Sequence, residues 1–311
     1  MQIELITVGC VCADVITRPV DKFPERGHLE LISQLEIHLG GLAAVTAAVF
    51  AQLGGKSALI GKLGADGFGD YVTGVLNHAG VNTEHVRREL AEHTSATVVL
   101  VTSEGERTFL HHLGTNGTTT PDDIDMDLAK QAKAFHWGGP GVTPALTGEG
   151  MGKVFGELRQ AGVMTSMDTC FDGSGTWFPL IEEALPHLDV VMSSLDEARH
   201  YTGKTEPEDI VRFFRSFGVG HVMLKLGGDG MIVEDSEESH HLKAHSVTPV
   251  DTTGAGDAAC AGFLYGLLNG WGLHRSGRLA NAVGGLTVQH MGGAEAIVSL
   301  EDTVAFMESG S

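Results

Sequence analysis

The sequence predicts an α/β fold built on a doubly wound, mostly parallel sheet flanked by helices, and three observations support this prediction. From residue 133 onward, short apolar runs typical of buried strands alternate with segments of helical periodicity. Strands that alternate with helices in this way form parallel sheets. Two other segments, 15–38 and 94–112, alternate polar and apolar residues, as exposed strands do. Polar residues or glycine follow the predicted strands at Asp14, Asp168, Ser194 and Gly227.

The elements can be placed in order along the chain. Buried strands are expected where apolar residues dominate, at 3–9, 57–62, 134–137, 163–168, 190–192 and 221–225. In the exposed segments, short strands are expected at 29–32 and 34–38 and a hairpin at 94–101 with 107–111. Helices are expected at 41–53, 68–79, 147–161, 178–185 and within 195–215. Gly80 closes the second of these helices.

Length and charge limit the possible function. With 311 residues, 42% of them hydrophobic, the chain can form one large domain, residues 1–311. The formal net charge of −20 argues against nucleic acid or an anionic membrane as a partner. Residues 258–294 contain arginine and histidine but no carboxylate. This window is either a wall suited to nucleotide phosphates or a buried pair of helices.

The cysteines and the N-terminus indicate a cytoplasmic protein. Cys10, Cys12, Cys170 and Cys260 lie among apolar or small residues, and no second cysteine or histidine pair completes a zinc site. Buried, reduced thiols are therefore expected. The sequence starts directly with a strand, and no apolar stretch reaches the ~18 residues of a membrane span.

Residues 250–264 contain the strongest functional signal. Gly254, Ala255 and Gly256 would leave their backbone N–H groups open at a helix N-terminus, which is a favourable position for a polyphosphate. Asp257 would not bind that phosphate, because two anions repel each other. It is suited instead to accept the proton of an attacking hydroxyl. The motif therefore predicts phosphoryl transfer to an alcohol.

The glycine-rich motifs of the chain also fit other patterns. Residues 254–259 also fit the dinucleotide pattern G-x-G-x-x-A, but no acidic residue follows at the required spacing, so an NAD-dependent oxidoreductase is excluded. A glycine-rich helix start capped by Asp257 is the purely structural alternative. The loose phosphate-loop motif at 54–57 fails because position 50 is Phe50 rather than glycine.

In this longer context, the chain resembles the ribokinase-like (PfkB) family of carbohydrate and nucleoside kinases. Residues 251–264 match the family's C-terminal pattern. Further landmarks occur in order: Asp14, Gly40-Gly41, residues 61–69, Gly105-Glu-Arg107, Gly114-Thr-Asn116, Glu197 of a degenerate N-x-x-E element, and residues 226–230. The resemblance implies a ribokinase-like fold in which segments 15–38 and 94–112 form a small β lid over the sugar, often paired between subunits.

The resemblance also implies where the acceptor alcohol binds. The carboxylate of Asp14 would accept hydrogen bonds from vicinal hydroxyls, and Gly40 and Gly41 would let the backbone approach the ligand. Further acceptor residues would come from the lid and its end, where Arg107, His111, His112 and Asn116 lie. His111 and His112 would face opposite sides of their strand, so at most one points into the site. We select Asn116 and His112.

The chain departs from the family at two acceptor positions. Relatives have an asparagine that touches the sugar where this chain has Val45, whose isopropyl group donates no hydrogen bond. The acceptor therefore lacks a group there, or lid residues replace the contact. Residues 168–172 occupy the place of a D-x-N-x-R element, and the missing arginine argues against an acceptor with a carboxylate or phosphate.

On the nucleotide side, the resemblance implies contacts with ATP from Lys225, Gly227, Asp229, Gly230 and Asn281. Glu197 would orient a water bound to Mg²⁺, although a carboxylate in the first turn of a helix is also common without any ligand. A K⁺ ion would be held by Asp251 and Thr253, with Gly292-Gly293 on its other side.

We conclude that the sequence predicts an ATP-dependent kinase for a hydroxymethyl group of a sugar or sugar-like small molecule, with Mg²⁺ and in some relatives K⁺ as cofactors. A nucleoside kinase is the alternative, with an apolar shelf at Val45, Phe109 and Trp137. A non-catalytic sugar- or nucleotide-binding regulator is the alternative of another class, which the intact motif around Asp257 disfavours. Apolar lid residues, expected to remain partly exposed in a monomer, further predict a homodimer joined through the lids: Ile16, Leu29, Leu31, Ile37, Val98, Leu100 and Phe109.

Overall fold

A large sheet forms the centre of the molecule. The computed structural model describes residues 2–104, 106–294, 297 and 299–309. In spatial order the sheet contains β13 (Ser239–Leu242), β12 (Met231–Glu234), β11 (His221–Lys225), β10 (Val190–Ser194), β9 (Met164–Asp168), β8 (Ala134–Gly138), β1 (Leu5–Gly9), β4 (Ser57–Gly64) and β5 (Val86–Glu89). All neighbours are parallel except β11 with β12 and β12 with β13, which are antiparallel.

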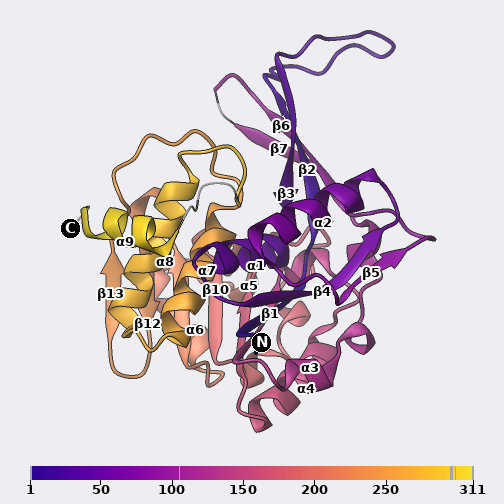
Figure 1. The fold of residues 1–311 in the computed structure, drawn as a ribbon. Coiled ribbons are helices and arrows are strands. Elements are labelled where there is room, and N and C mark those ends of the chain that lie inside the picture. The colour runs from indigo at the N-terminus through magenta and orange to yellow at the C-terminus, as the bar shows by residue number, and fades with distance from the viewer. Residues whose placement is uncertain (1, 105, 295–296, 298, 310–311) are drawn as a thin grey trace.

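Helices cover both faces of this sheet (Figure 1). One face packs on α3 (Met126–Ala129), α4 (Gly148–Gln160), α5 (Leu195–Thr202) and α6 (Pro207–Arg215), around a core that contains Trp137 and Phe155. The other face packs on α1 (Leu42–Gln52), α2 (Gly67–Ala79), α7 (Ala255–Leu268), α8 (Leu273–Thr287) and α9 (Leu300–Ser309). The predicted fold class is confirmed. Among the described helices, none is long and apolar enough to cross a bilayer.

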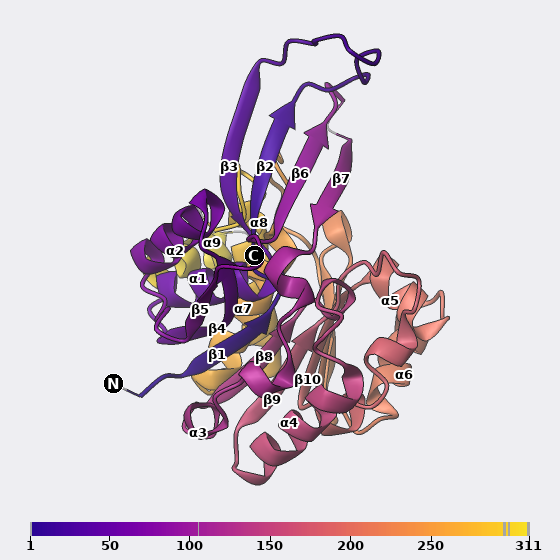
Figure 2. The ribbon, with the colours of Figure 1, turned by 90° about the vertical axis from the view of Figure 1, so that its right-hand side faces the viewer.

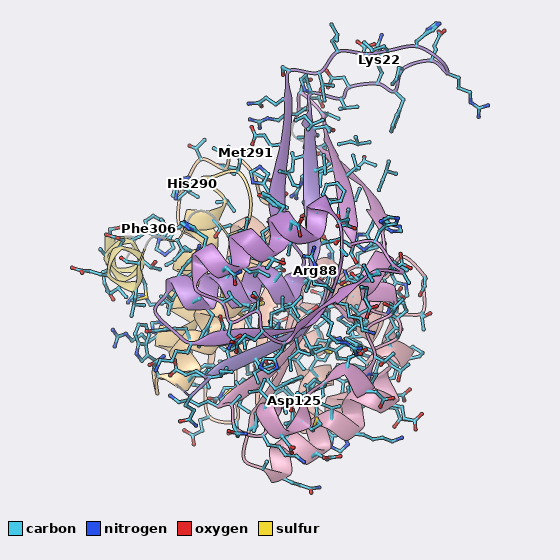
Figure 3. The ribbon with its side chains drawn as sticks, turned by 45° about the vertical axis from the view of Figure 1, so that its right-hand side comes forward. Lys22, Arg88, Asp125, His290, Met291 and Phe306 are labelled. Carbon is cyan, nitrogen blue, oxygen red and sulfur yellow. The ribbon has the colours of Figure 1, made fainter. Side chains whose placement is uncertain are left out.

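A second, four-stranded sheet projects from the main body as the lid (Figures 1 and 2). Its strands lie in the order β3 (Gln34–Gly40), β2 (Cys12–Arg18), β6 (Ala96–Val101) and β7 (Arg107–His112). Lys22, in the connection between β2 and β3, lies at the far end of the lid from the main sheet (Figure 3).

The direction of winding reverses beside β1. The chain passes from β1 to β4 on one side, whereas β8, β9, β10 and β11 follow one another on the other side. Such a reversal opens a crevice at the carboxyl ends of the strands, where ligands bind in open α/β sheets. The lid leaves the main sheet at this point, because β2 follows β1 directly. The topology therefore places the site between the lid and the ends of β1, β8 and β9.

Three expected elements differ from the structure. Residues 178–185 form no α-helix but two short 3₁₀ turns, Phe178–Leu180 and Leu185–His187. Pro186 removes a donor at the end of the segment, and Trp177 precedes it with a left-handed φ of 57°. Residues 29–32 form no strand. Asp14 does not follow the first strand directly but lies within β2.

Candidate active site

The glycine turn that precedes Asp257 adopts the predicted conformation. Gly254 has a left-handed φ of 71° and directly precedes α7, and no side chain caps the helix; the N–H of Ala255 makes only a long bond of 3.4 Å to the Thr252 carbonyl. A Cβ added to Gly254 would lie 2.5 Å from the Cα of Gly293, so two backbone segments meet here without side chains between them. The uncapped amides and the positive end of the helix dipole fit the charge of a polyphosphate.

Asp257 lies in the first turn of α7, where Thr46 of α1 donates a hydrogen bond to its backbone carbonyl at 3.1 Å. Burial and, to a smaller extent, the neighbouring charge of Asp168 raise the pKa of its carboxyl group to about 8, although the ammonium group of Lys225 lowers it. A carboxylate whose pKa lies near neutral pH is suited to accept a proton.

Lys225 makes a contact that the sequence does not predict. Its ammonium group donates to both oxygens of Asp168 at 2.8 Å, between the ends of β11 and β9. The side chains are 13% and 1% exposed, respectively. Lys225 was expected to bind the nucleotide phosphates, whereas in the structure its charge is paired inside the protein.

On the acceptor side, Asp14 belongs to a polar row that crosses all four lid strands. The register pairs Asp14 with His38 on β3 and with Thr97 on β6, and Thr97 with His111 on β7. Cys12 donates to the Asp14 carboxylate at 3.3 Å. The hydroxyl of Thr97 lies 3.1 Å from Nδ1 of His111. Burial raises the pKa of Asp14 and lowers that of His111. The carboxylate and its neighbours offer several hydrogen-bonding groups to a polyol.

The register places His111, rather than the selected His112, on the face of the lid that carries Asp14. His112 pairs with Ala96, and Ala96 with Ala13, so His112 lies on the face opposite to Asp14. His111 is the residue on the Asp14 face. The sequence predicts that only one of the two faces the site, but the choice depends on strand pairing, which the sequence does not show.

Other predicted acceptor residues are engaged within the protein. Asn116 is buried; it accepts from the backbone N–H of Val11 at 3.2 Å and donates to the Cys10 sulfur at 3.4 Å. It thus holds the connection between β1 and β2. Val45 is buried in the core beside Gly293. Gly41 has a left-handed φ of 94° and packs against the carbonyl of Cys10 at the start of α1.

Three of the predicted nucleotide residues, Gly227, Asp229 and Gly230, lie in a loop after β11. Gly227–Asp229 make an exposed 3₁₀ turn, and a Cβ at Gly227 or Gly228 would meet nothing within 4 Å. Gly230 has a φ of 93° and no space for a side chain, because a Cβ would lie 1.9 Å from the carbonyl of Leu242. Asn281 on α8 donates to the Lys243 carbonyl at 2.5 Å.

Glu197 is held in place at the start of α5. Its Oε2 accepts from Thr169 at 3.0 Å and from the backbone N–H of Ser194 at 3.3 Å. Ser194 and Glu197 form a reciprocal capping box, so the carboxylate also has a structural role. Its place beside the ends of β9 and β10 brings it to the same edge of the sheet as Asp168.

The loop before Asp257 is organised by Asp251. Its Oδ1 accepts from the backbone N–H and the hydroxyl of Thr253, at 2.9 and 2.7 Å, and its Oδ2 from the backbone N–H of Gly292 at 3.2 Å. Arg107 reaches this loop from the lid, donating to Thr253 at 3.1 Å and lying 3.9 Å from Asp251. Gly105, part of the same predicted motif, lies outside the described residues.

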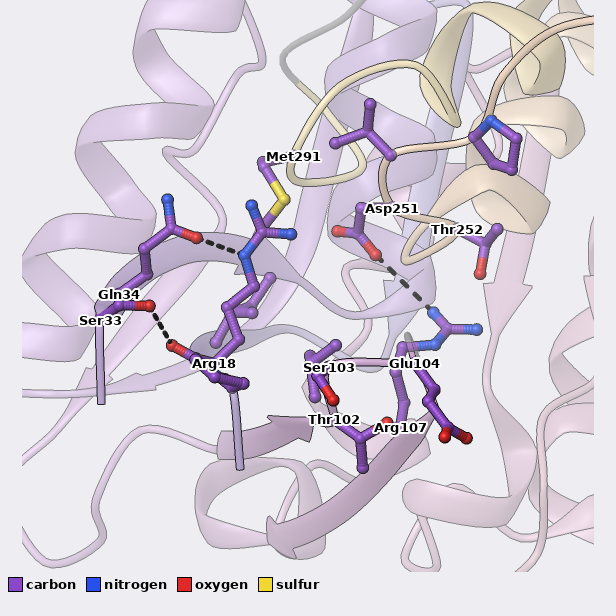
Figure 4. A pocket seen from close by; sticks show the side chains of 15 residues that line it. Arg18, Ser33, Gln34, Thr102, Ser103, Glu104, Arg107, Asp251, Thr252 and Met291 are labelled. Atoms are coloured by element: carbon purple, nitrogen blue, oxygen red, sulfur yellow. Dashed lines mark hydrogen bonds and ion pairs between the residues drawn. The ribbon is translucent and has the colours of Figure 1, made fainter. Parts of the chain in front are cut away.

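A pocket of about 490 Å³ lies between the outer part of the lid and this loop (Figure 4). Arg18, Gln34 and Arg107 line it from the lid, and Asp251, Thr252 and Met291 line it from the body. Arg18 donates to the side chain of Gln34. The pocket therefore lies between the two parts of the molecule.

The carboxylate-free window 258–294 is a pair of packed helices. α7 and α8 approach closely at Gly262, where a Cβ would lie 3.0 Å from the Cα of Ala280. Arg275 stacks on Trp271 at 3.9 Å, and Arg278 donates to the Met307 carbonyl of α9 at 2.8 Å. These two arginines therefore have partners within the protein.

Comparison with known proteins agrees with this geometry. The pfkB family carbohydrate kinase model matches residues 2–299. The chain is 30% identical over 285 residues to the aminoimidazole riboside kinase of Salmonella typhimurium, with 88% of each protein covered. Among solved structures, the Arabidopsis thaliana ribokinase complexed with ribose and ATP is similar with a TM-score of 0.86 and 25% identity, over 99% of both chains. An E. coli protein assigned as a ribokinase II, solved with ATP and Mg²⁺, has a TM-score of 0.86 at 22% identity, also over 99% of both chains. The chain belongs to the pfkB family of carbohydrate kinases, ATP-dependent enzymes that phosphorylate an alcohol.

Proposed function

We propose that this kinase transfers the γ-phosphate of ATP to a hydroxymethyl group of a sugar or sugar-like molecule, with Asp257 as the general base. One observation carries the proposal: Asp257 lies in the first turn of α7, whose N-terminus has no side-chain cap. Asp14 lies on the lid strand that directly follows β1. The acceptor would therefore bind between a carboxylate that holds hydroxyls and a carboxylate that removes a proton.

Each residue has a defined part in the transfer. Asp14 accepts hydrogen bonds from hydroxyls of the acceptor, and Thr97 and His111 extend this polar surface along the lid. Asp257 takes the proton of the attacking hydroxyl as its oxygen bonds to phosphorus. The amides of Ala255 and Gly256, with the α7 dipole, stabilise the negative charge on the transferred group.

The site also has residues that fit the expected cations. Mg²⁺, when bound with ATP, neutralises charge on the phosphate oxygens. Glu197 supplies the oxygen chemistry that suits a water bound to this ion, and its carboxylate is already fixed by Thr169 and Ser194. K⁺ beside Asp251, Thr253 and Gly293 is part of the proposal as well, and it would share Asp251 with Arg107. Exchange of K⁺ for Na⁺ in an activity assay tests it.

A nucleoside kinase is the second candidate, and Phe109 supports it. Of the three residues of the predicted apolar shelf, Val45 and Trp137 are buried in the core. Phe109 is 53% exposed and lies two residues from His111 on β7, on the Asp14 face. An aromatic ring at this place could stack on a base.

We also propose a homodimer in which the outer faces of the lids pair. The outer face carries one apolar row, in which Ile37 pairs with Val15, Val15 with Val98, and Val98 with Leu110. Leu110 is 57% exposed. Two expectations need correction: Ile16 and Phe109 lie on the Asp14 face, and Leu29 and Leu31 lie in the loop between β2 and β3. Because the outer row is apolar and partly exposed, most of all at Val98 and Leu110, its burial against a second copy would be favourable.

A screen of acceptors tests the function directly. The purified protein is incubated with Mg²⁺, ATP and single sugars or nucleosides, and ADP formation is measured, with the Asp257→Asn variant as the blank. Phosphorylation of a sugar at its hydroxymethyl carbon supports the proposal. Turnover of nucleosides but not of free sugars would favour the second candidate.

A further inference from the structure

We propose that Asp168 and Lys225 act as a positioning pair, which fixes the first turn of α7 and places a positive charge beside the Gly254–Gly256 turn. The inference rests on the proposed role of Asp257 as the base. It assigns to Lys225 a function other than contact with ATP.

The pair spans three strands at the edge where the site lies. Asp168 is the last residue of β9 and Lys225 the last residue of β11, with β10 between them. Asp168 pairs with Met192 of β10, whereas Lys225 pairs with Ser194, two residues farther along. The lysine side chain therefore crosses β10 diagonally to reach the carboxylate.

The partners of Lys225 account for its hydrogen-bonding capacity. An ammonium group has three donors. Two of them reach the Asp168 oxygens at 2.8 Å, and the sulfur of Cys260 on α7 lies at 3.6 Å. A phosphate oxygen could bind this ammonium group only by displacing one of these partners. The contact with Cys260 also links the pair to the helix that carries Asp257.

The pair touches the catalytic turn itself. A Cβ added to Gly256 would lie 3.2 Å from Nζ of Lys225, so glycine at this position allows the lysine to approach the backbone. Gly256 directly precedes Asp257. A shift of the lysine would therefore move the turn that presents both the amides and the base.

The local charges indicate why a cation is needed here. The carboxyl group of Asp257 is affected by Asp168, Glu197 and Asp14, all of which raise its pKa, whereas Lys225 lowers it. Burial raises the pKa of Asp168 to about 6, and Lys225 opposes this shift. Without Lys225, several acidic groups would face the position of an anionic nucleotide without compensation.

Stability alone gives a weak reason to keep such a pair. Replacing a buried ion pair with apolar residues is often neutral or stabilising, whereas removing one partner leaves a buried charge and is costly. The fold therefore does not require these two charges, and a role in the site explains them better.

The test uses Lys225→Met, Asp168→Asn and the double variant Asp168→Leu/Lys225→Met. For each variant, kcat, KM for ATP, the unfolding temperature and the pH profile of kcat/KM are measured. Lys225→Met should lower kcat by about 10²-fold because the turn is misplaced, with little change in KM for ATP. In Lys225→Met, the fall of kcat/KM on the acid side of the pH profile (the acid limb) should move to higher pH, because the lysine lowers the pKa of Asp257. In Asp168→Asn it should move to lower pH, because Asp168 raises that pKa; each shift should be about one unit.

A second buried pair provides the matched control. Lys62 and Asp123 lie 2.7 Å apart, with side chains 11% and 8% exposed, on β4 and in a 3₁₀ turn, and Arg87 also lies 2.7 Å from Asp123. Lys62→Met should lower the unfolding temperature but leave kcat and the pH profile as in the wild type. The double variant at 168 and 225 should unfold near the wild-type temperature and still have a low kcat, which separates folding from function.

Three results would overturn the inference. Acid limbs that stay in place or move in the same direction would show that the pair does not act on the base. A higher KM for ATP at unchanged kcat in Lys225→Met would make the lysine a phosphate ligand. Wild-type kcat in the double variant would exclude a positioning role even if the single variants fail to fold. If Asp257→Asn remains active, the proposed base is wrong. If Asp257→Asn is inactive but the pH profiles of Lys225→Met and Asp168→Asn do not shift, only this inference is wrong.

Discussion

Gly40 leaves the space in which the carboxylate of Asp14 lies. A Cβ added to Gly40 would be 2.3 Å from Cγ of Asp14 and 2.3 and 2.4 Å from its two oxygens. Any side chain at Gly40 must therefore displace the carboxylate. The glycine was predicted to admit a ligand to the backbone, and the structure shows that it admits the side chain of a neighbouring strand.

Gly40→Ala should therefore reproduce the defect of a missing Asp14 carboxylate. We expect a higher KM for the acceptor at nearly unchanged KM for ATP, measured by steady-state kinetics. Gly74→Ala on α2 is the control, because a Cβ there meets nothing within 4 Å. If Gly40→Ala binds the acceptor normally, the carboxylate does not hold the acceptor.

Asp14→Ala should raise KM for the acceptor far more than KM for ATP. Loss of hydrogen bonds to a charged group costs about 1.5–3 kcal/mol, which sets the expected size of the change. Circular dichroism provides the check on folding. An equal effect on both substrates would mean that Asp14 supports the fold rather than the acceptor.

Asp257→Asn should lower kcat by roughly 10²–10⁴-fold, because the amide keeps the shape but accepts no proton. Binding of ATP should persist, since the predicted phosphate contacts are backbone amides; calorimetry with ATP measures this. Retention of more than about a tenth of the wild-type turnover is incompatible with a base at this position.

The enzyme should lose activity at acid pH, because Asp257 becomes protonated. Asp257 must be deprotonated to act, and burial raises its pKa to about 8. Activity is therefore expected above that pH, and kcat/KM for the acceptor should fall by about tenfold per unit as the pH decreases below it. A profile that stays flat from pH 8 down to pH 6 contradicts the assignment.

Val98→Asp and Leu110→Asp should each separate the proposed dimer, because they place a charge in the apolar outer row of the lid. Light scattering of the wild type should give twice the 32.8 kDa of one chain, and the variants should approach one chain. Leu90→Asp is the control, at a residue that is 94% exposed and lies outside the lid strands. A wild-type mass of one chain would refute the dimer.

Much of the fold can be predicted from the sequence because local patterns determine it. The alternation of apolar strands and amphipathic helices after residue 133 is visible residue by residue, and so is the glycine turn before Asp257. The segment 178–185 has the apolar spacing of a helix but forms two short 3₁₀ turns, between Trp177 with its left-handed φ and Pro186. The apolar spacing alone predicts a helix, because it takes no account of the backbone at Trp177 and Pro186.

The site is harder to predict where it depends on contacts between distant segments. The choice of His111 over His112 follows from the pairing of β6 with β7. Lys225 resembles a phosphate ligand in the sequence, because its partner Asp168 lies 57 residues away and only the order of the strands brings them together. Asn116 similarly makes hydrogen bonds with Val11 and Cys10, which lie 105 and 106 residues away in the sequence.

The contact between Gly254 and Gly293 sets a limit on when the enzyme can become active during its synthesis. The turn that presents Asp257 packs against residue 293, whereas Asp14 and Gly40 are made near the start of the chain. Domains generally fold as units while the ribosome extends them from the N-terminus. A nascent chain that already contains Asp14 and Asp257, but not yet Gly293, would lack the support of the catalytic turn and should not yet phosphorylate its acceptor.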